Sequence, residues 1–340
     1  MIRAHQRIMT VLIAGDIGGT KTNLGLYSRE AGPRAPLHEE TFPNAGYSSL
    51  TEIVTTFLAR AGMTADYAVF GIAGPVLRKE AAATNLPWVI RTEELTRALR
   101  IRSARLLNDL EAMAWGVLLL QKGDLLTLHA GKAAPGGALG IIAPGTGLGE
   151  AFLTREGESY RAHSSEGGHA DFAPTNDLEI GLLQYLLRRY PHVSYERVCS
   201  GLGIPNVYEY MKEARFAAES NRVSEKLART EDQTPIIIEA ALDPVSPCRL
   251  CRETIDLFVS ILGAEAGNLA LKVMATGGIY LGGGIPIRLK NILGSGPFME
   301  AFLRKGRFSH LMERIPVHVI LNPKVALIGA AACGLNEPAG

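Results

Sequence analysis

The sequence lacks a strong charge of either sign, a disulfide framework and a long uninterrupted apolar run. Its 340 residues contain 35 Lys and Arg against 34 Asp and Glu, which gives a formal net charge of +1. A chain so balanced has no overall field that would draw it to nucleic acid or to a membrane surface. We therefore expect a protein that acts on small molecules, without nucleic acid or membrane as partner.

Cysteine is scarce and irregularly spaced, because the only four are Cys199, Cys248, Cys251 and Cys333. This usage suits a reducing compartment better than a secreted scaffold held by disulfides. The apolar stretch near the start ends at Asp16 after a few residues, which is too short for a signal peptide. The longest apolar stretch, 261–285, contains charged residues and several glycines, which argues against a membrane span. We expect a cytoplasmic protein.

The pattern of strands and helices predicts an α/β protein. Three segments, 11–22, 139–150 and 273–285, each run from an apolar strand directly into a glycine-rich turn. Helical patterns lie between them, and this alternation is typical of α/β folds. Since 340 residues are more than a single hydrophobic core usually contains, we expect two domains.

The helical patterns have recognisable ends. One helix is expected shortly after Ser49, and another over 177–190, where Asn176 marks the start and Pro191 the end. The apolar stripe of this second helix would consist of Ile180, Leu183, Leu187 and Tyr190. The small-residue segment 325–336 predicts a closely packed helix. The domains are expected at 8–115, completed by 325–336, and at 116–324.

The first glycine-rich segment, GDIGGTKT, is neither of the two common phosphate motifs. Its glycines at 15, 18 and 19 do not fit G-x-G-x-x-G, and Thr20 replaces the second glycine of G-x-x-x-x-G-K-[ST]. Both motifs open a helix, whereas residues 22–27 alternate in period two and predict a strand. The segment is therefore interpreted as a hairpin.

Such a hairpin can bind an oxyanion through inward-facing backbone N–H groups, or it can be an ordinary glycine turn. Asp16, at the end of the first strand, could hold Mg²⁺ through water, since magnesium gives up its hydration reluctantly. The candidate phosphate-binding residues of this loop are Gly18, Gly19, Thr20, Lys21 and Thr22.

The chain resembles the bacterial glucokinases of the actin-like ATPase superfamily. GDIGGTKT and APGTGLG (143–149) resemble the two phosphate motifs of that superfamily, and LGGG (281–284) resembles its adenosine motif. NDLEA (108–112), SSEGGHADFAP (164–174) and YERVCSG (195–201), with TNLPW, narrow the resemblance to glucokinases. It runs from about residue 10 to residue 334.

The resemblance implies a two-domain fold of actin-like, or ribonuclease H-like, α/β domains with a cleft between them. It implies ATP and Mg²⁺ as cofactors, glucose as the sugar and, since relatives are often dimers, a homodimer. The phosphates would contact Gly145, Thr146 and Gly147, and the adenosine would lie against Gly282, Gly283 and Gly284.

For phosphoryl transfer to a sugar hydroxyl, the protein mainly has to align the reactants and stabilise the charge of the transition state. The resemblance makes Asp109 the base that accepts the proton of the 6-hydroxyl, with Asn108 on a neighbouring hydroxyl. Without the resemblance, a helix cap is the alternative interpretation of the pair. The remaining sugar-binding residues implied are Asn85, Glu166, His169 and Glu196.

Other interpretations compete with this one. The Glu166–Asp171 segment, with His163 nearby, could be a metal cluster, but the sequence has neither H-E-x-x-H nor a cysteine-rich knuckle. Cys248 and Cys251 could form a zinc or redox pair, but no partner C-x-x-C exists. A sugar-sensing regulator would need a DNA-binding domain, and only about ten residues precede the first strand. A kinase for another hexose or an amino sugar, or one using another phosphoryl donor, stays open.

Overall fold

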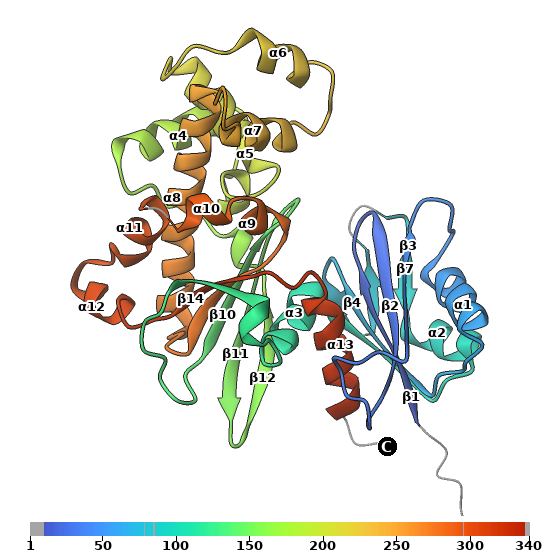
Figure 1. The fold of residues 1–340 in the computed structure, drawn as a ribbon. Helices are drawn as coiled ribbons and strands as arrows, with labels where there is room; N and C mark the ends of the chain where they lie inside the picture. Colours follow the sequence, from blue (N-terminus) through green and yellow to red (C-terminus); the bar gives the residue numbers. More distant parts are fainter. Residues whose placement is uncertain (1–9, 78, 84–85, 295, 337–340) are drawn as a thin grey trace, which may run out of the picture. The chain divides into compact units, whose positions relative to one another are not determined.

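The computed structural model describes residues 10–77, 79–83, 86–294 and 296–336, and the chain forms two compact units (Figure 1). The first unit comprises the chain up to Lys122 together with the segment from Asn322 onward. The second unit is Gly123–Leu321. Each unit is built on its own β-sheet with helices packed against it, which confirms the predicted α/β class.

The first unit has a five-stranded sheet in the order β3-β2-β1-β4-β8. Strands β1, β2 and β3 are antiparallel neighbours, whereas β1, β4 and β8 run parallel. The strands are β1 (Val11–Ile17), β2 (Lys21–Ser28), β3 (His38–Pro43), β4 (Tyr67–Ile72) and β8 (Ser103–Asn108); a separate small sheet contains β5 (Val76–Leu77), β6 (Glu80–Ala82) and β7 (Val89–Arg91).

Helices cover both faces of this sheet, α1 (Leu50–Ala61) and α2 (Thr92–Leu99) on one and α3 (Asp109–Val117) and α13 (Val325–Asn336) on the other (Figure 1). Successive residues of a strand point to opposite faces. Ile13 accordingly joins the apolar core under α1, and its neighbours Leu12 and Ala14 join the core under α13. The fold thus buries both faces of β1.

The second unit has a six-stranded sheet in the order β12-β11-β10-β13-β14-β9. Its first five strands repeat the pattern of the first unit, since β10, β11 and β12 are antiparallel and β10, β13 and β14 are parallel. The strands are β9 (Leu125–His129), β10 (Leu139–Pro144), β11 (Leu148–Glu156), β12 (Ser159–Ser165), β13 (Gly278–Leu281) and β14 (Val317–Ile320).

Most helices of this unit gather around α8 (Arg249–Val273), the long helix in Figure 1. This helix is long and apolar enough to cross a membrane by length and composition, but 78% of its apolar window is buried inside the protein, as expected of a core helix. The other helices are α4 (Asp177–Leu187), α5 (Gly203–Glu213), α6 (Asn221–Leu227), α7 (Thr234–Leu242), α9 (Gly284–Arg288), α10 (Lys290–Leu293), α11 (Pro297–Leu303) and α12 (Ser309–Met312), with 3₁₀ turns η1 (Lys122–Asp124), η2 (Gly167–His169), η3 (Tyr195–Arg197) and η4 (Gly306–Phe308).

Two predicted elements differ from the structure. The strand expected from residue 273 begins only at Gly278, because Val273 is the last residue of α8 and Met274 ends that helix in a left-handed conformation. The helix α4 begins after Asn176 as predicted but ends at Leu187, and only Leu183 and Tyr190 of the predicted stripe pack against the core. Ile180 and Leu187 are exposed, and the buried side chains are Glu179, Leu182, Tyr185 and Leu186.

Candidate active site

The first glycine-rich loop is the turn of the β1–β2 hairpin, so the predicted hairpin is confirmed. The Gly18 N–H donates to the Lys21 carbonyl at 3.0 Å. Asn44, just after β3, braces the turn. Its amide nitrogen donates to the Gly18 carbonyl at 2.8 Å and its backbone N–H to the Thr20 carbonyl at 2.9 Å. The loop is thereby held in one conformation while Thr20 and Lys21 remain exposed.

Thr22 has a different role from the one predicted. Its side chain is completely buried, and its hydroxyl donates to Asn44 Oδ1 at 2.8 Å. A hydroxyl so placed has no access to a bound phosphate. Thr22 and Asn44 therefore support the loop from below, and the prediction of Thr22 as a side-chain donor to phosphate was wrong.

Asp16 lies one residue before the end of β1 and is half-buried. Its Oδ2 accepts a hydrogen bond from Asn23 Nδ2 at 3.1 Å. Burial raises the pKa of Asp16, and the Asn23 hydrogen bond and the Lys21 charge oppose that shift. A nearby divalent cation would compensate the cost of this buried carboxylate, so the residue fits a Mg²⁺ site.

Asn108 and Asp109 occupy the junction between β8 and α3. The Asn108 Oδ1 caps the helix by accepting from the N–H groups of Leu110 at 2.9 Å and Glu111 at 3.4 Å, and its Nδ2 donates to the Gly74 carbonyl at 3.1 Å. The helix-cap interpretation is thus correct for Asn108. Asp109 is the first residue of α3, where the positive end of the helix favours an ionised carboxylate.

The parallel pairing of β1, β4 and β8 brings Asp16 and Asp109 to the same edge of the first unit's sheet. Ile17 pairs with Ile72, and Ile72 pairs with Asn108. In open α/β sheets, ligands bind at the carboxyl ends of the strands. The first unit therefore gathers its candidate phosphate loop, metal carboxylate and base at that edge.

The second glycine-rich loop, Gly145–Gly147, is the turn between β10 and β11, with Thr146 exposed at its tip. The Gly201 N–H donates to the Gly145 carbonyl at 2.8 Å, which holds the turn from the side. Glu196 Oε2 accepts from the Leu148 N–H at 3.0 Å. A Cβ at Gly147 would collide with the same carboxylate. One oxygen of the predicted sugar-binding Glu196 is therefore committed to this loop.

Glu166 directly precedes η2, the turn that follows β12, and His169 is the last residue of that turn. Their side chains are largely exposed, with His169 Nε2 4.0 Å from Glu166 Oε2. A Cβ on Gly168 would overlap the Leu148 carbonyl oxygen, so only glycine lets η2 pack against β11. The Tyr195 N–H donates to the Ala170 carbonyl at 3.0 Å, which joins this segment to η3.

The predicted adenosine motif, Gly282–Gly284, connects β13 to α9. Gly283 has φ of +84°, and a Cβ there would meet the Pro144 carbonyl at 2.6 Å. Gly282 N–H donates to the Ile142 carbonyl at 2.9 Å. The third glycine-rich segment thus packs against the residues that lead into the second. The second unit brings together Gly145–Gly147, the η2 turn, Glu196 and Gly282–Gly284.

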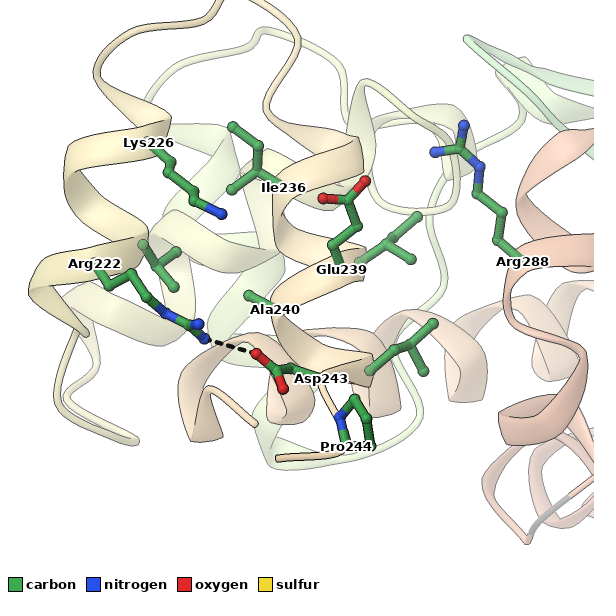
Figure 2. A pocket seen from close by; sticks show the side chains of 11 residues that line it. Arg222, Lys226, Ile236, Glu239, Ala240, Asp243, Pro244 and Arg288 are labelled. Atoms are coloured by element: carbon green, nitrogen blue, oxygen red, sulfur yellow. Dashed lines mark hydrogen bonds and ion pairs between the residues drawn. The ribbon is translucent and has the colours of Figure 1, made fainter. Parts of the chain in front are cut away.

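A pocket of about 640 Å³ is lined by residues of α6 and α7, by the segment that follows α7 and by Arg288 of α9 (Figure 2). Its walls are partly apolar, with Ile236 and Ile238 on α7. Arg222 is paired with Asp243 at 3.0 Å, and hydrogen bonds from the Ser246 backbone and from Arg222 lower the Asp243 pKa to about 2. Arg288, which also lines the pocket, is the last residue of α9, the helix that begins at Gly284. None of the sequence-predicted site residues lines it.

Within the described ranges, no group of three or more His, Cys, Asp or Glu side chains could hold a metal ion. His163 is engaged by Thr154 at 2.8 Å and stacks on Phe152. Cys248 and Cys251 are both buried, and burial raises the pKa of Cys251 far above its usual value. A single carboxylate such as Asp16 suits Mg²⁺, which binds one or two carboxylates with water and substrate phosphates.

Sequence reasoning missed the residues that brace the loops. Asn44 gave no signal because it is a single polar residue after a short strand. Two buried glutamates, Glu150 and Glu265, were overlooked because only the fold brings Glu150 against η2 and Glu265 beside Glu150. Asn85, predicted to line the sugar site, lies outside the described residues.

Comparison with known proteins finds a matching family model and similar sequences. A family model described as glucokinase matches residues 13–337. The chain is 42% identical to a glucokinase of Nostoc punctiforme over 96% of this chain and 99% of that protein.

Solved structures with a similar fold are also found. A glucokinase from an Antarctic psychrotroph matches with TM-score 0.81 and 31% identity, covering 96% of this chain and 99% of that one. A more distant ROK family glucokinase from Streptomyces griseus, solved with glucose and AMPPNP, matches with TM-score 0.63 and 20% identity over 96% and 98% of the chains, and shows the shared actin-like fold. The chain belongs to the glucokinase family.

Proposed function

We propose that this protein transfers the γ-phosphoryl group of ATP to the 6-hydroxyl of D-glucose. Besides family membership, one observation carries the proposal. Glu196, in the candidate sugar-binding set, is hydrogen-bonded to Leu148, the residue that follows the second phosphate loop. A carboxylate fixed at this place couples the position of a sugar to that of a phosphate, as direct transfer between them requires.

Hexoses present several adjacent hydroxyls, each both donor and acceptor, so their recognition calls for carboxylate and imidazole groups. We assign Glu166, His169 and Glu196 to this task. The exposed side chains of Glu166 and His169 are available to a ligand, and the η2 backbone beneath them is fixed by Gly168. Asn108 keeps its helix-capping role, and its amide lies next to the base.

Asp109 is the proposed base. A phosphoryl group passes through a loose transition state, so the base mainly orients the hydroxyl and accepts its proton late in the transfer. The start of α3 stabilises the ionised form that this task needs. Backbone N–H groups of the Gly18–Gly19 and Gly145–Gly147 turns, with Thr146, would bind the phosphate oxygens. When bound, Mg²⁺ neutralises charge on the phosphates, and Asp16 would hold it through water.

The pocket beside α9 is the proposed site for the adenosine end of ATP. Its volume suits a nucleoside, and its walls combine isoleucines with cationic side chains. One of those side chains, Arg288, lies on α9, the helix that begins at Gly284. Arg288→Ala should raise the KM for ATP about tenfold and leave the KM for glucose nearly unchanged, because Arg288 lies on the nucleotide side. An unchanged KM for ATP would contradict the assignment.

A coupled assay with a panel of hexoses, amino sugars and phosphoryl donors tests the proposed reaction. We expect glucose with Mg-ATP to have the highest kcat/KM, and phosphate to be found on the 6-oxygen. A preference for mannose or an acetylated amino sugar would replace glucose as the substrate, and a preference for polyphosphate would replace ATP. We further propose that the protein is cytoplasmic and that it forms a homodimer. Light scattering after size exclusion would test the dimer.

A further inference from the structure

A buried pair of acidic side chains lies directly beneath the η2 turn. Glu150 on β11 is 2% exposed and Glu265 on α8 is completely buried. Glu150 and Glu265 lie close enough for a side-chain hydrogen bond. Two ionised carboxylates cannot form that bond, because neither has a proton to donate.

Glu150 has a specific deficit that a proton would correct. Its Oε1 is buried and has no hydrogen-bond partner in the described part of the chain when both carboxyls are ionised. Glu265, in contrast, is already satisfied, since Oε2 accepts from Asn268 Nδ2 at 2.7 Å and Oε1 faces Lys272 Nζ at 3.2 Å. A buried polar atom without a partner is costly. One proton held between Glu150 and Glu265 removes that cost.

The surrounding charges fit a pair that carries one negative charge. Lys272 and Lys305 are the cations that face the pair, and Lys305 is bound to the Ala264 carbonyl and to Asn268 Oδ1 at 2.8 and 2.6 Å. Burial first, and then the charge of Glu265, raises the pKa of Glu150 to about 8, with Lys272 opposing the shift. The nearby Tyr195 hydroxyl and Cys199 thiol both have pKa values raised by burial, so they add no charge near neutral pH.

The pair contacts both segments that carry the candidate sugar-binding residues. A Cβ on Gly167 would overlap the Glu150 carboxylate, so that carboxylate lies directly against the backbone between Glu166 and His169. Asn268 Nδ2 reaches from Glu265 to the Tyr195 hydroxyl at 2.9 Å, next to Glu196. A change of charge at the pair therefore acts on η2 and η3 together.

We propose that Glu150 and Glu265 share one proton and that the protonated pair positions the η2 and η3 segments for hexose binding. The two glutamates are positioning residues that do not touch the sugar, and this role rests on the proposed function of Glu166, His169 and Glu196. Loss of the proton places two negative charges beneath the turn. Their repulsion displaces η2 and weakens glucose binding at alkaline pH.

The test compares the wild type with Glu150→Gln, whose amide donates permanently to Glu265 and cannot titrate. With saturating Mg-ATP, the wild-type KM for glucose should rise at least about fivefold between pH 7 and 9.5. The variant should lack that rise and keep kcat at pH 7 within about threefold. Glu156→Gln, an exposed site on the same strand, should keep the wild-type profile. A Glu150→Gln profile that rises as the wild type does would overturn the proposal.

Equilibrium unfolding gives a readout independent of activity. A folded-state pKa raised above the ordinary value stabilises the fold at low pH, and that stabilisation is lost as pH rises from about 4.5 to about 8. Glu150→Gln should lack this component of the pH dependence. Glu150→Gln could lose this pH dependence of stability and still show the wild-type pH profile of the glucose KM. That result would confirm the shared proton and refute the positioning role. If Glu150→Gln does not fold, Glu265→Gln is measured instead. It removes the second negative charge, so the alkaline rise of the glucose KM should be smaller than in the wild type, and an unchanged rise would overturn the proposal.

The underlying sugar site is tested separately with His169→Ala. This variant should raise the KM for glucose far more than the KM for ATP. If it does not, the assignment of the sugar site fails, whereas the unfolding measurement still decides whether the buried pair holds a proton.

Discussion

Hydrogen bonds within the protein distinguish side chains that support the candidate site from side chains that are available to a ligand, and Glu196 does both. Thr22 and Asn44 are satisfied by each other and hold the first phosphate loop. Asn108 is satisfied by the start of α3. Glu166 and His169, by contrast, expose most of their polar surface. The second group is where a ligand can form new hydrogen bonds.

Asp109→Asn isolates the proposed base. The amide keeps the shape and can still hydrogen-bond to the sugar, but it cannot accept the proton of the 6-hydroxyl. We expect kcat to fall about 10²- to 10⁴-fold, with glucose affinity changed only slightly. Steady-state kinetics together with glucose titration by calorimetry measures both quantities. Turnover that stays at the wild-type level would exclude Asp109 as the base.

At the scale of elements, the tight turns depend on where glycine is placed. Gly168 lets η2 pack against the Leu148 carbonyl, and Gly283 lets the third glycine segment approach Pro144. Helix ends follow familiar rules, since Ser49 caps α1 and Asn176 caps α4 through their side chains. The turns therefore hold the site residues in position, and the helices hold the turns in position.

Gly168→Ala tests this dependence. The added methyl group would collide with the Leu148 carbonyl, so η2 must move, and we expect a loss of stability of about 1–3 kcal/mol and a higher KM for glucose. Gly123→Ala is the matched control, because a Cβ there meets nothing within 4 Å. Chemical denaturation and glucose kinetics on both variants provide the comparison. Equal behaviour of the two would show that η2 is not held by this contact.

At the scale of the whole molecule, the chain leaves the first unit after Lys122 and returns to it at Asn322. The returning helix α13 packs closely on α3, where a Cβ on Gly329 would overlap the Ala112 carbonyl oxygen. Its small and apolar residues complete the core on that face of the sheet. The first unit is therefore built from two distant parts of the sequence.

Removing everything after Leu321 should unfold the first unit although the second unit is intact in sequence. The deletion exposes the core beneath α13, which costs on the order of 5 kcal/mol or more from lost apolar burial. Limited proteolysis with mass spectrometry should show new cleavages before residue 122 and protection within 123–321. A truncation after Asn336, which keeps α13, serves as the control. A protected first unit in the shorter protein would contradict this prediction.

The sequence by itself determined the features that depend on local chemistry. Period-two alternation after Lys21 identified the β1–β2 hairpin, and capping residues identified the starts of α1 and α4. The motifs also identified the family, because each requires particular residues at fixed spacing. These signals are local, since glycine conformations, caps and strand alternation are set by neighbours in the chain.

Only the tertiary structure decided which side chains are buried and what they meet. Two residues of the predicted α4 stripe, Ile180 and Leu187, are exposed. Val273 lies in a helix because α8 is stabilised by packing along its length. Three features depend on residues that are far apart in sequence. They are the repeated strand order of the two sheets, the hydrogen bond between Thr22 and Asn44, and the pair Glu150–Glu265. Such contacts depend on long-range packing, which no local pattern of residues specifies.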